Sequence, residues 1–315
     1  MLLLLASVLL LAATSLAEAA RWAPLADPLT SFRFHYLIAA AVFVALGIWR
    51  RARVASALAA LVLVVNAAWV APLYLDDARD AAPGSPRLRV AHLNAQSGSL
   101  TLDGLRSFLV EQRPDVMVIL DPDTGWRDRV ARADLPLDVV YPRRGQRGAA
   151  RVLVLADVPV RDVGLAGEGL LPGGDSLPGS SVAMTIDSLG EPIRLLALHT
   201  HSPTSPSHLS TRDRQLRAAA RWVRAQDLPV VVVGDLNATL WSHRLRAFLS
   251  ETGLVDSERG HGYDASWPTI LGPFGIPIDH ALHDPSLTVV RRALGPSLGS
   301  EHHSLVVDVA LADAR

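Results

Sequence analysis

The sequence predicts an α/β domain, with stacked layers around a sheet-rich core, preceded by transmembrane helices. Hydrophobic residues make up 50% of the 315-residue chain, and the excess lies in three long apolar runs in its first quarter. Beyond them, short valine-rich runs of strand length alternate with helical patterns. Strands and helices mixed in this order are typical of domains built from packed layers.

The apolar runs occupy residues 1–17, 36–49 and 54–75. A bilayer crossing takes about 20 apolar residues, so the third run is long enough, whereas the second also needs residues 32–36. The arginine-rich turn at 50–53 faces the cytoplasm by the positive-inside rule. The chain after residue 75 is therefore expected on the extracytoplasmic face.

The first run has two interpretations. It is either a third span or a signal peptide that ends near Ala17, Ala19 and Ala20. A signal peptide normally begins with basic residues, and here only the terminal amine is available, which favours a span. Both interpretations predict a multi-pass protein of the cell membrane, with two to three transmembrane helices in residues 1–75.

Residues 76–86 (DDARDAAPGSP) read as a linker, and residues 87–315 as one soluble domain. Helices are predicted at 102–112, at 210–226 from a Ser N-cap, and at 242–252 before Gly253. The strand-like runs are RLRVAHLNA (87–95), DVMVIL (115–120), ARVLVLA (150–156), SVAMTID (181–187), IRLLALHT (193–200), PVVVVGD (229–235) and SLVVDVAL (304–311).

Composition excludes some functions for the soluble part. The chain has no cysteine, which rules out thiolate chemistry and Cys-ligated zinc. Six of the 30 basic residues and five of the 31 acidic residues precede residue 87, so the remainder is slightly acidic. Proteins that track long nucleic acid usually carry a basic face, and this balance favours a small or lipid-linked substrate.

Polar residues of a narrow kind follow the strand-like runs. Any one of them alone is more often a turn residue, a helix cap or a surface residue. Together they offer oxygen and imidazole ligands, which suit Mg²⁺ or Mn²⁺ before Zn²⁺ and suit phosphoryl chemistry. The residues concerned are Asn94, Asp121, His199, His201, Asp235, Asn237, Asp279, Glu301 and His302.

The stretch VVVVGDLNATLWS, residues 230–242, is the most distinctive of these. Four consecutive valines predict a strand buried on both faces, and it runs directly into Asp235 and Asn237. Period-two alternation places both side chains on one face, provided that the extended conformation continues as far as Asn237.

The order of these motifs resembles the endonuclease/exonuclease/phosphatase family, also called the DNase I-like family. The resemblance rests on GDLNAT followed by WS, then SWP, IDH and a terminal Ser-acid-His before an apolar strand, and covers residues 87–311. The apolar N-terminus is similar to that of the membrane-anchored bacterial branch. The resemblance implies a four-layer α/β sandwich, two mixed sheets face to face with helices outside, and a site at one edge.

The resemblance also implies roles for individual residues. Asp235 would position or deprotonate the attacking water, Asn237 would hold a phosphate oxygen, and Asp279 would orient His302 in a dyad. His199 would contact the phosphate, with His201 as a competitor for substrate contact. Metal ligands would be Asn94, Asp121 and Glu301, and Trp241 and Trp267 either line the pocket or pack in the core.

Two acids depart from the family pattern. Asp121 stands where the family usually has Glu, with Asp123 as a substitute, and Glu301 stands where it usually has Asp. Two functions therefore remain: a membrane-anchored phosphoesterase that depends on Mg²⁺ or Mn²⁺, or a membrane-tethered binding or scaffold protein with a degenerate site. Substrates of the enzyme would be nucleic acid, a phospholipid head group or a small phosphorylated metabolite. No obligate protein partner is evident.

Overall fold

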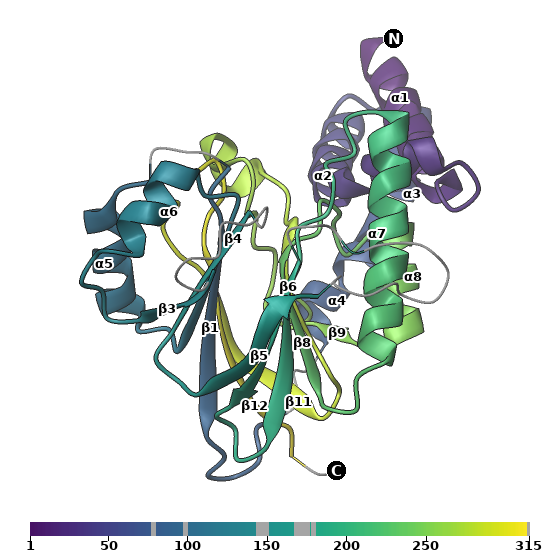
Figure 1. Ribbon diagram of the computed structural model, residues 1–315. Helices are drawn as coiled ribbons and strands as arrows, with labels where there is room; N and C mark the ends of the chain where they lie inside the picture. The colour runs from purple at the N-terminus through teal and green to yellow at the C-terminus, as the bar shows by residue number, and fades with distance from the viewer. Residues whose placement is uncertain (77–79, 97–99, 143–150, 167–176, 178–180, 314–315) are drawn as a thin grey trace.

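The computed structural model describes residues 1–76, 80–96, 100–142, 151–166, 177 and 181–313. Figure 1 shows two sheets facing each other, with helices on their outer sides and an apolar helical region at the N-terminus. The predicted four-layer α/β sandwich, with N-terminal helices before it, is confirmed.

In the part of the chain that the structure describes, both sheets have six strands and are mixed. The first has the order β11 (Leu287–Leu294), β12 (Leu305–Leu311), β1 (Arg87–Asn94), β2 (Val116–Leu120), β4 (Val152–Ala156) and β3 (Asp138–Tyr141). The second has the order β5 (Val160–Leu165), β6 (Val182–Asp187), β7 (Pro192–Ala197), β8 (Val230–Asp235), β10 (Asp279–His283) and β9 (Val255–Asp256). Each contains one parallel pair, β1 with β2 and β7 with β8, and the other pairs are antiparallel.

The main core lies between the sheets. Along β1, Val90 faces this core, whereas Ala91 and Leu93 belong to the layer beneath the outer helices. On β8, Val231 and Val233 face inward, and Val230 and Val232 face the helices on the other side. Burial of both faces explains why these strands are continuous apolar runs instead of alternating ones.

Among the described residues, two helices cover each sheet. Helices α5 (Leu102–Gln112) and α6 (Thr124–Val130) pack on the first sheet, and α7 (Pro206–Arg224) and α8 (His243–Thr252) on the second (Figure 1). Helix α8 begins after the Ser242 cap and ends at Gly253, as predicted. Helix α7 begins earlier than predicted, because Ser205 caps it and Pro206 supplies a preset φ at its first position.

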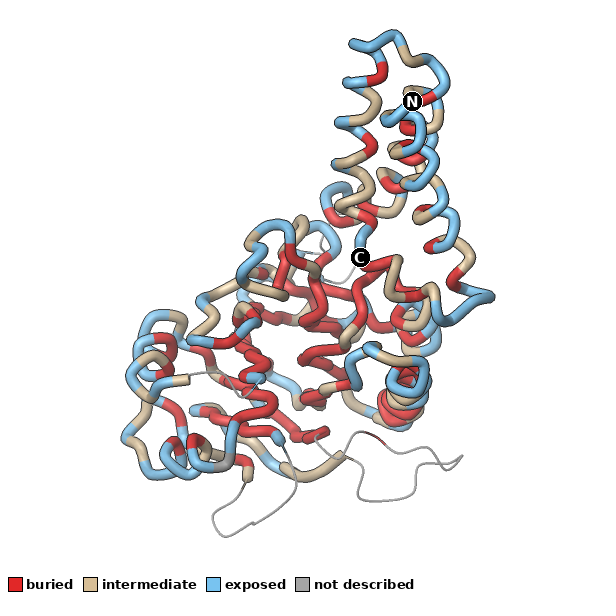
Figure 2. Tube along the Cα trace, turned by 90° about the horizontal axis from the view of Figure 1, so that it is seen from above, coloured by how far each residue is buried: buried red, intermediate tan, exposed pale blue. Residues whose placement is uncertain are grey.

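The N-terminal region holds α1 (Leu2–Ala19), the 3₁₀ segment η1 (Pro24–Phe32), α2 (Arg33–Trp49), α3 (Arg53–Val70) and the short α4 (Pro72–Leu75). Three helical stretches, Leu2–Ala19, Pro24–Trp49 and Arg53–Val70, are long and apolar enough to cross a membrane. Polar contacts join them: Asn66 Nδ2 donates to Thr14 Oγ1 (3.2 Å), and the buried Arg33 pairs with the partly exposed Glu18 (2.8 Å). Figure 2 shows these helices projecting from one side of the sandwich.

The helical region is packed against the sandwich. Val70 and Leu73 form a buried cluster with Leu240 and Trp241, and Phe34 stacks on Tyr263 with ring centroids 4.0 Å apart. Of the predicted linker, residues 77–79 lie outside the described residues.

Candidate functional site

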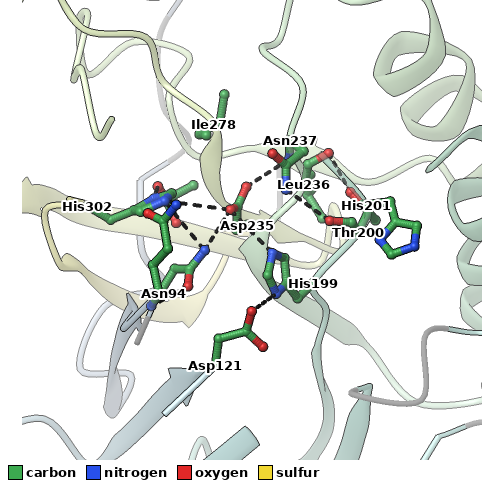
Figure 3. A network of polar contacts seen from close by, with 12 residues as sticks. Asn94, Asp121, His199, Thr200, His201, Asp235, Leu236, Asn237, Ile278 and His302 are labelled. Atoms are coloured by element: carbon green, nitrogen blue, oxygen red, sulfur yellow. Dashed lines mark hydrogen bonds and ion pairs between the residues drawn. The ribbon is translucent and has the colours of Figure 1, made fainter. Parts of the chain in front are cut away.

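Polar side chains from the ends of both sheets meet at one edge of the sandwich, as Figure 3 shows. Asn94 ends β1, Asp121 follows β2, Asp235 ends β8 and Asp279 begins β10. His302 comes from the loop before β12. Except for Asp279, which is fully buried behind His302, they border a cleft of about 780 Å³, whose lining includes Asn94, Asp121, His199, Asp235, Asn237 and His302.

Gly234 explains how a buried strand delivers Asp235 to this edge. Its φ is +150°, and a Cβ atom there would lie 1.9 Å from the carbonyl oxygen of Leu198 on the neighbouring chain segment. Only glycine permits so close an approach of two backbones. The strand then ends at Asp235, and Asn237 has a left-handed φ of +48°.

Asp235 is the centre of the polar network. Its Oδ1 accepts a hydrogen bond from the backbone N–H of Asn237 (2.8 Å), and its Oδ2 accepts one from Asn94 Nδ2 (2.8 Å). The same Oδ2 lies 3.6 Å from His199 Nε2 and 3.9 Å from His302 Nε2. Asp235 is 2% exposed, so this carboxylate is held in one orientation.

The carboxylate of Asp279 contacts two imidazole rings. Its Oδ2 lies 2.8 Å from His302 Nδ1, and its Oδ1 lies 2.9 Å from His92 Nε2. Burial alone would raise the pKa of Asp279, but these two rings outweigh it and hold that pKa well below its usual range. Burial likewise disfavours protonation of His302, whereas the Asp279 carboxylate, assisted by Asp235, raises the pKa of His302 to about 9.

The Asp279 contact fixes Nδ1 of His302 as the donor. Nε2 of the same ring consequently faces Asp235 and the cleft. The loop that carries His302 is fixed by Ser300, whose hydroxyl donates to the carbonyl oxygen of Asn94 (2.6 Å) and accepts from the His302 N–H (3.0 Å). The Ser-acid-His motif thus joins the end of β1 to the Asp279–His302 pair.

His199 bridges the two sheets. Its Nδ1 lies 3.4 Å from Asp121 Oδ2, while its Nε2 faces Asp235. Burial opposes protonation of His199, but Asp121 and Asp235 together raise its pKa. Asp121 also pairs with Arg151 Nε at 2.9 Å, and its backbone has a left-handed φ of +50°. His201 lines the same cleft but is exposed, beside His208, outside the central network.

Three predicted placements differ from the structure. Glu301 is exposed and is not among the lining residues, because the backbone that turns His302 inward turns Glu301 outward, and its carbonyl accepts from Thr269. Asp123 is the N-cap of α6 and does not substitute for Asp121. Asn237 reaches the cleft through a turn, not through continued extension, and its Nδ2 donates to the carbonyl oxygen of Thr200 (2.9 Å).

The two candidate pocket residues Trp241 and Trp267 lie in different parts of the structure. Trp267 lines the cleft, with its ring centroid 6.2 Å from that of His302. Trp241 is 2% exposed and belongs to the cluster that joins the sandwich to α3, where its Nε1 donates to the carbonyl oxygen of Trp69 (3.0 Å). The pocket interpretation of Trp241 is therefore corrected to core packing.

The donor atoms fit a divalent cation. One atom each from Asp235, Asp279 and His302 lies within 4.8 Å of the others, and all three residues are buried. Carboxylate oxygens and a neutral imidazole nitrogen are ligands for such ions. Asn94 adjoins this group through Asp235, whereas Asp121 lies on the other side of His199.

His92 was missed by the sequence analysis. It is buried, it binds the oxygen of Asp279 that His302 leaves free, and its Nδ1 has no hydrogen-bond partner among the described residues. The available signal was its position two residues before Asn94, which places both side chains on the same face of β1. Other lining residues that the sequence analysis missed include Pro28, Ser31 and Phe32, which come from the N-terminal helical region.

A model of the endonuclease/exonuclease/phosphatase family matches residues 91–302.

The chain belongs to this family.

Solved structures of the endonuclease/exonuclease/phosphatase family share its fold. A member from Beutenbergia cavernae is 20% identical, with a TM-score of 0.54 over 73% of this chain and 72% of that chain. A member from Bacteroides thetaiotaomicron is 14% identical, with a TM-score of 0.53 over 73% and 99% of the two chains. TDP2 from D. rerio, solved with a single-strand DNA product, is 15% identical, with a TM-score of 0.53 over 71% and 98%. No curated protein matches the sequence.

Family membership establishes the general chemistry. The chain has the fold of a phosphoesterase-type hydrolase, as expected from its motifs. Identities of 20% or less carry the fold alone, so the substrate must be inferred from this chain's own site.

Proposed function

We propose that this protein is a membrane-anchored phosphoesterase that depends on a divalent cation, with its catalytic domain, residues 87–315, on the extracytoplasmic side. The observation that supports it most is the convergence of Asp235 with the Asp279–His302 pair in a cleft. Folding requires neither a buried acid facing a cleft nor a carboxylate-oriented imidazole beside it, whereas hydrolysis of a phosphate ester uses both.

Each residue of the network has a role in this proposal. Asp235 Oδ2, fixed by Asn94, orients the attacking water and accepts its proton. Protonated His302, fixed by Asp279, stabilises the negative charge that develops on the phosphoryl oxygens. His199 donates to a phosphate oxygen, and Asn237 contributes its amide at the same rim.

The cation is proposed to be Mg²⁺ or Mn²⁺. Asn94 and Asp121 would hold it, while Asp235 would keep its role toward water and Nε2 of His302 would keep its proton. When bound, it would neutralise charge on a phosphate oxygen and make the nearby water more acidic. Glu301 is left out of this set because its side chain points away from the cleft.

The membrane topology is proposed to include three spans in residues 1–75, followed by the linker at 76–86. Helix α1 packs with α3 through Thr14 and Asn66, and Glu18 accepts a hydrogen bond from Trp69 Nε1 (2.7 Å). These contacts favour a retained span over a cleaved signal peptide. With the 50–53 turn in the cytoplasm, η1 and the sandwich share the outer side.

The scaffold alternative is favoured by one observation. The Asp121 carboxylate is already paired with Arg151 and faces His199, which competes with metal binding.

Hydrolysis of bis(p-nitrophenyl) phosphate by the full chain, with Mg²⁺, Mn²⁺ or EDTA, tests the proposal. Turnover that EDTA abolishes and that His302→Ala lowers at least about 100-fold supports the enzyme. His261→Ala is the matched control, because His261 is not among the residues that line the cleft. No turnover of this diester or of p-nitrophenyl phosphate with either cation contradicts it and favours the scaffold.

A further inference from the structure

The η1 segment, which connects the candidate spans α1 and α2, is clamped to the hydrolase domain by Asp27. Asp27 Oδ2 accepts hydrogen bonds from Arg212 Nη2 (2.6 Å) and from Ser242 Oγ (2.8 Å). Its Oδ1 accepts one from the backbone N–H of His243 (3.0 Å). Asp27 and Arg212 are at most 2% exposed, so this is a built contact between the membrane region and the sandwich.

The same clamp reaches the cleft. Arg212 uses its other terminal nitrogen, Nη1, to donate to the carbonyl oxygen of Asn237 (3.0 Å). Pro28, Ser31 and Phe32 of η1 then line the cleft beside Asp235 and Asn237. Part of the wall of the candidate active site is therefore supplied by the connector between two apolar helices.

A second apolar segment lies beside the cleft. The 3₁₀ segment η2 (Thr269–Phe274) follows Trp267 and exposes Ile270 (89%), Leu271 (51%) and Phe274 (57%). The carbonyl oxygen of Phe274 lies 2.8 Å from His35 Nε2, in the first turn of α2. The tip of η2 is thus held beside the outer end of a candidate membrane span.

Exposed apolar groups at this position indicate contact with a membrane. Contiguous exposed apolar side chains mark interaction surfaces, and aromatic residues gather where spans leave the bilayer. Trp22, Leu25 and Phe32, at the outer ends of α1 and α2, are also exposed (71%, 69% and 42%). Phe32 and Phe274 both contact His35 in the first turn of α2. The name apolar rim is used here for Trp22, Leu25, Phe32, Ile270, Leu271 and Phe274.

We propose that the cleft opens at the bilayer surface and that the protein hydrolyses a phosphate ester of a lipid in the same membrane. The apolar rim rests in the outer leaflet, and the lipid's hydrocarbon chains remain in the bilayer while its phosphate reaches Asp235 and His302. This inference rests on the proposed hydrolase function. In the reaction, the oxygen of water forms the new P–O bond as one of its protons passes to Asp235, and the ester P–O bond breaks. The alcohol leaves with a proton equivalent to the one that Asp235 took up, and the other hydrogen of that water stays on the product phosphate.

The depth of η2 is tested without any reaction. The chain has no cysteine, so Ile270→Cys carries one nitroxide label in the full chain, reconstituted in phosphatidylcholine nanodiscs. The label is expected to be accessible to oxygen and shielded from a water-soluble nickel chelate. The control label is placed at Glu191→Cys, in the exposed turn that precedes β7. This label is expected to be accessible to the nickel chelate and less accessible to oxygen. Equal nickel accessibility at both positions overturns the placement of the rim.

The substrate class is tested in vesicles of phosphatidylethanolamine and phosphatidylglycerol. The full chain is expected to release phosphate-containing head-group products or phosphatidic acid from these lipids. The triple variant Ile270→Ser, Leu271→Ser, Phe274→Ser is expected to hydrolyse these lipids at least about tenfold more slowly than the wild type. None of the three residues lines the cleft, so hydrolysis of bis(p-nitrophenyl) phosphate is expected to stay within about twofold. Val110→Ser, an exposed apolar residue on α5, is the matched control.

The outcomes separate the two proposals. Hydrolysis of the soluble diester or of single-stranded DNA, with no hydrolysis of either lipid, overturns the lipid substrate and leaves the proposed function standing. No hydrolysis of any substrate overturns both, and the label measurement then decides the placement of the rim by itself.

Discussion

Asp235 and Asp279 face each other as register partners on the antiparallel strands β8 and β10. Like charges directly opposed across a sheet are destabilising, and both residues are nearly inaccessible to water. The arrangement is tolerated because Asp279 binds His92 and His302, while Asp235 accepts hydrogen bonds from Asn94 and Asn237. The strand register therefore brings together the two carboxylates, Asp235 and Asp279, that the first two predictions concern.

Asp235→Asn is expected to lower kcat on bis(p-nitrophenyl) phosphate by about 10²- to 10⁴-fold, with little change in KM. The amide keeps the shape of the carboxylate but cannot accept the proton of water. Asp187→Asn, at the exposed end of β6, is the control and is expected to stay at the wild-type rate. An Asp235→Asn variant that retains hydrolysis would show that another group activates the water.

Asp279→Asn is expected to move the pH profile as well as to lower the rate. Asp279 is the main group that raises the pKa of His302 to about 9. Without its charge, burial still disfavours the imidazolium, so the pKa of His302 falls. If protonated His302 is the active form, the alkaline limb of kcat against pH moves to lower pH. A lowered rate with an unmoved alkaline limb would contradict the dyad and indicate a structural effect.

Gly234→Ala is expected to lower thermal stability sharply. The new Cβ would lie 1.9 Å from the Leu198 carbonyl oxygen, so β7 and β8 must separate or the backbone must shift. Gly190 also has a positive φ, +86°, but nothing lies within 4 Å of its Cβ position. Gly190→Ala therefore reports the backbone strain alone, about 1–2 kcal/mol. The melting temperatures of the two variants check this, and equal losses would mean that the close approach is not rigid.

The carboxyl group of Glu258 is expected to make the free energy of unfolding depend on pH. It is fully buried, both carboxylate oxygens lack a hydrogen-bond partner among the described residues, and burial raises its pKa to about 8. The unfolded chain releases this proton near pH 4.5, but the folded protein holds it until about pH 8. The free energy of unfolding therefore falls as pH rises through that window.

Glu258→Gln removes this dependence because the amide stays neutral. The variant's advantage in stability over the wild type is expected to be small at pH 4.5 and to grow to the order of a few kcal/mol at pH 8. Chemical denaturation at the two pH values measures it. A constant difference would show that Glu258 is ionised throughout, with Arg292 as its compensating charge.

Local patterns were sufficient for much of the fold. The apolar runs predicted the helical N-terminal region, and the strand-like runs at 87–95, 229–235 and 304–311 became β1, β8 and β12. Short or less apolar strands such as β3 and β5 gave no comparable signal, because most of their residues are exposed or half-buried and form no continuous apolar run. Helix α7 was placed late for a related reason, since its Pro206 start is polar and exposed.

The site shows the same division. The residue types at the strand ends indicated a cleft with Asp235, Asp279, His199 and His302, which the structure brings together. The sequence could not show that Glu301 turns outward, that Trp241 packs against α3, or that His92 binds Asp279. Each of these depends on which way a loop or strand presents its side chains to a distant element.

The amino-acid sequence by itself determined the apolar helices, the doubly buried strands and the supply of acid, amide and imidazole groups, because these follow from composition and short-range periodicity. Only the tertiary structure decided that β8 and β10 set Asp235 opposite Asp279, and that Asp27 ties the membrane region to Arg212 beside the cleft. Those contacts join residues 44 and 185 positions apart, and they arise from strand register and layer packing, which no local pattern encodes.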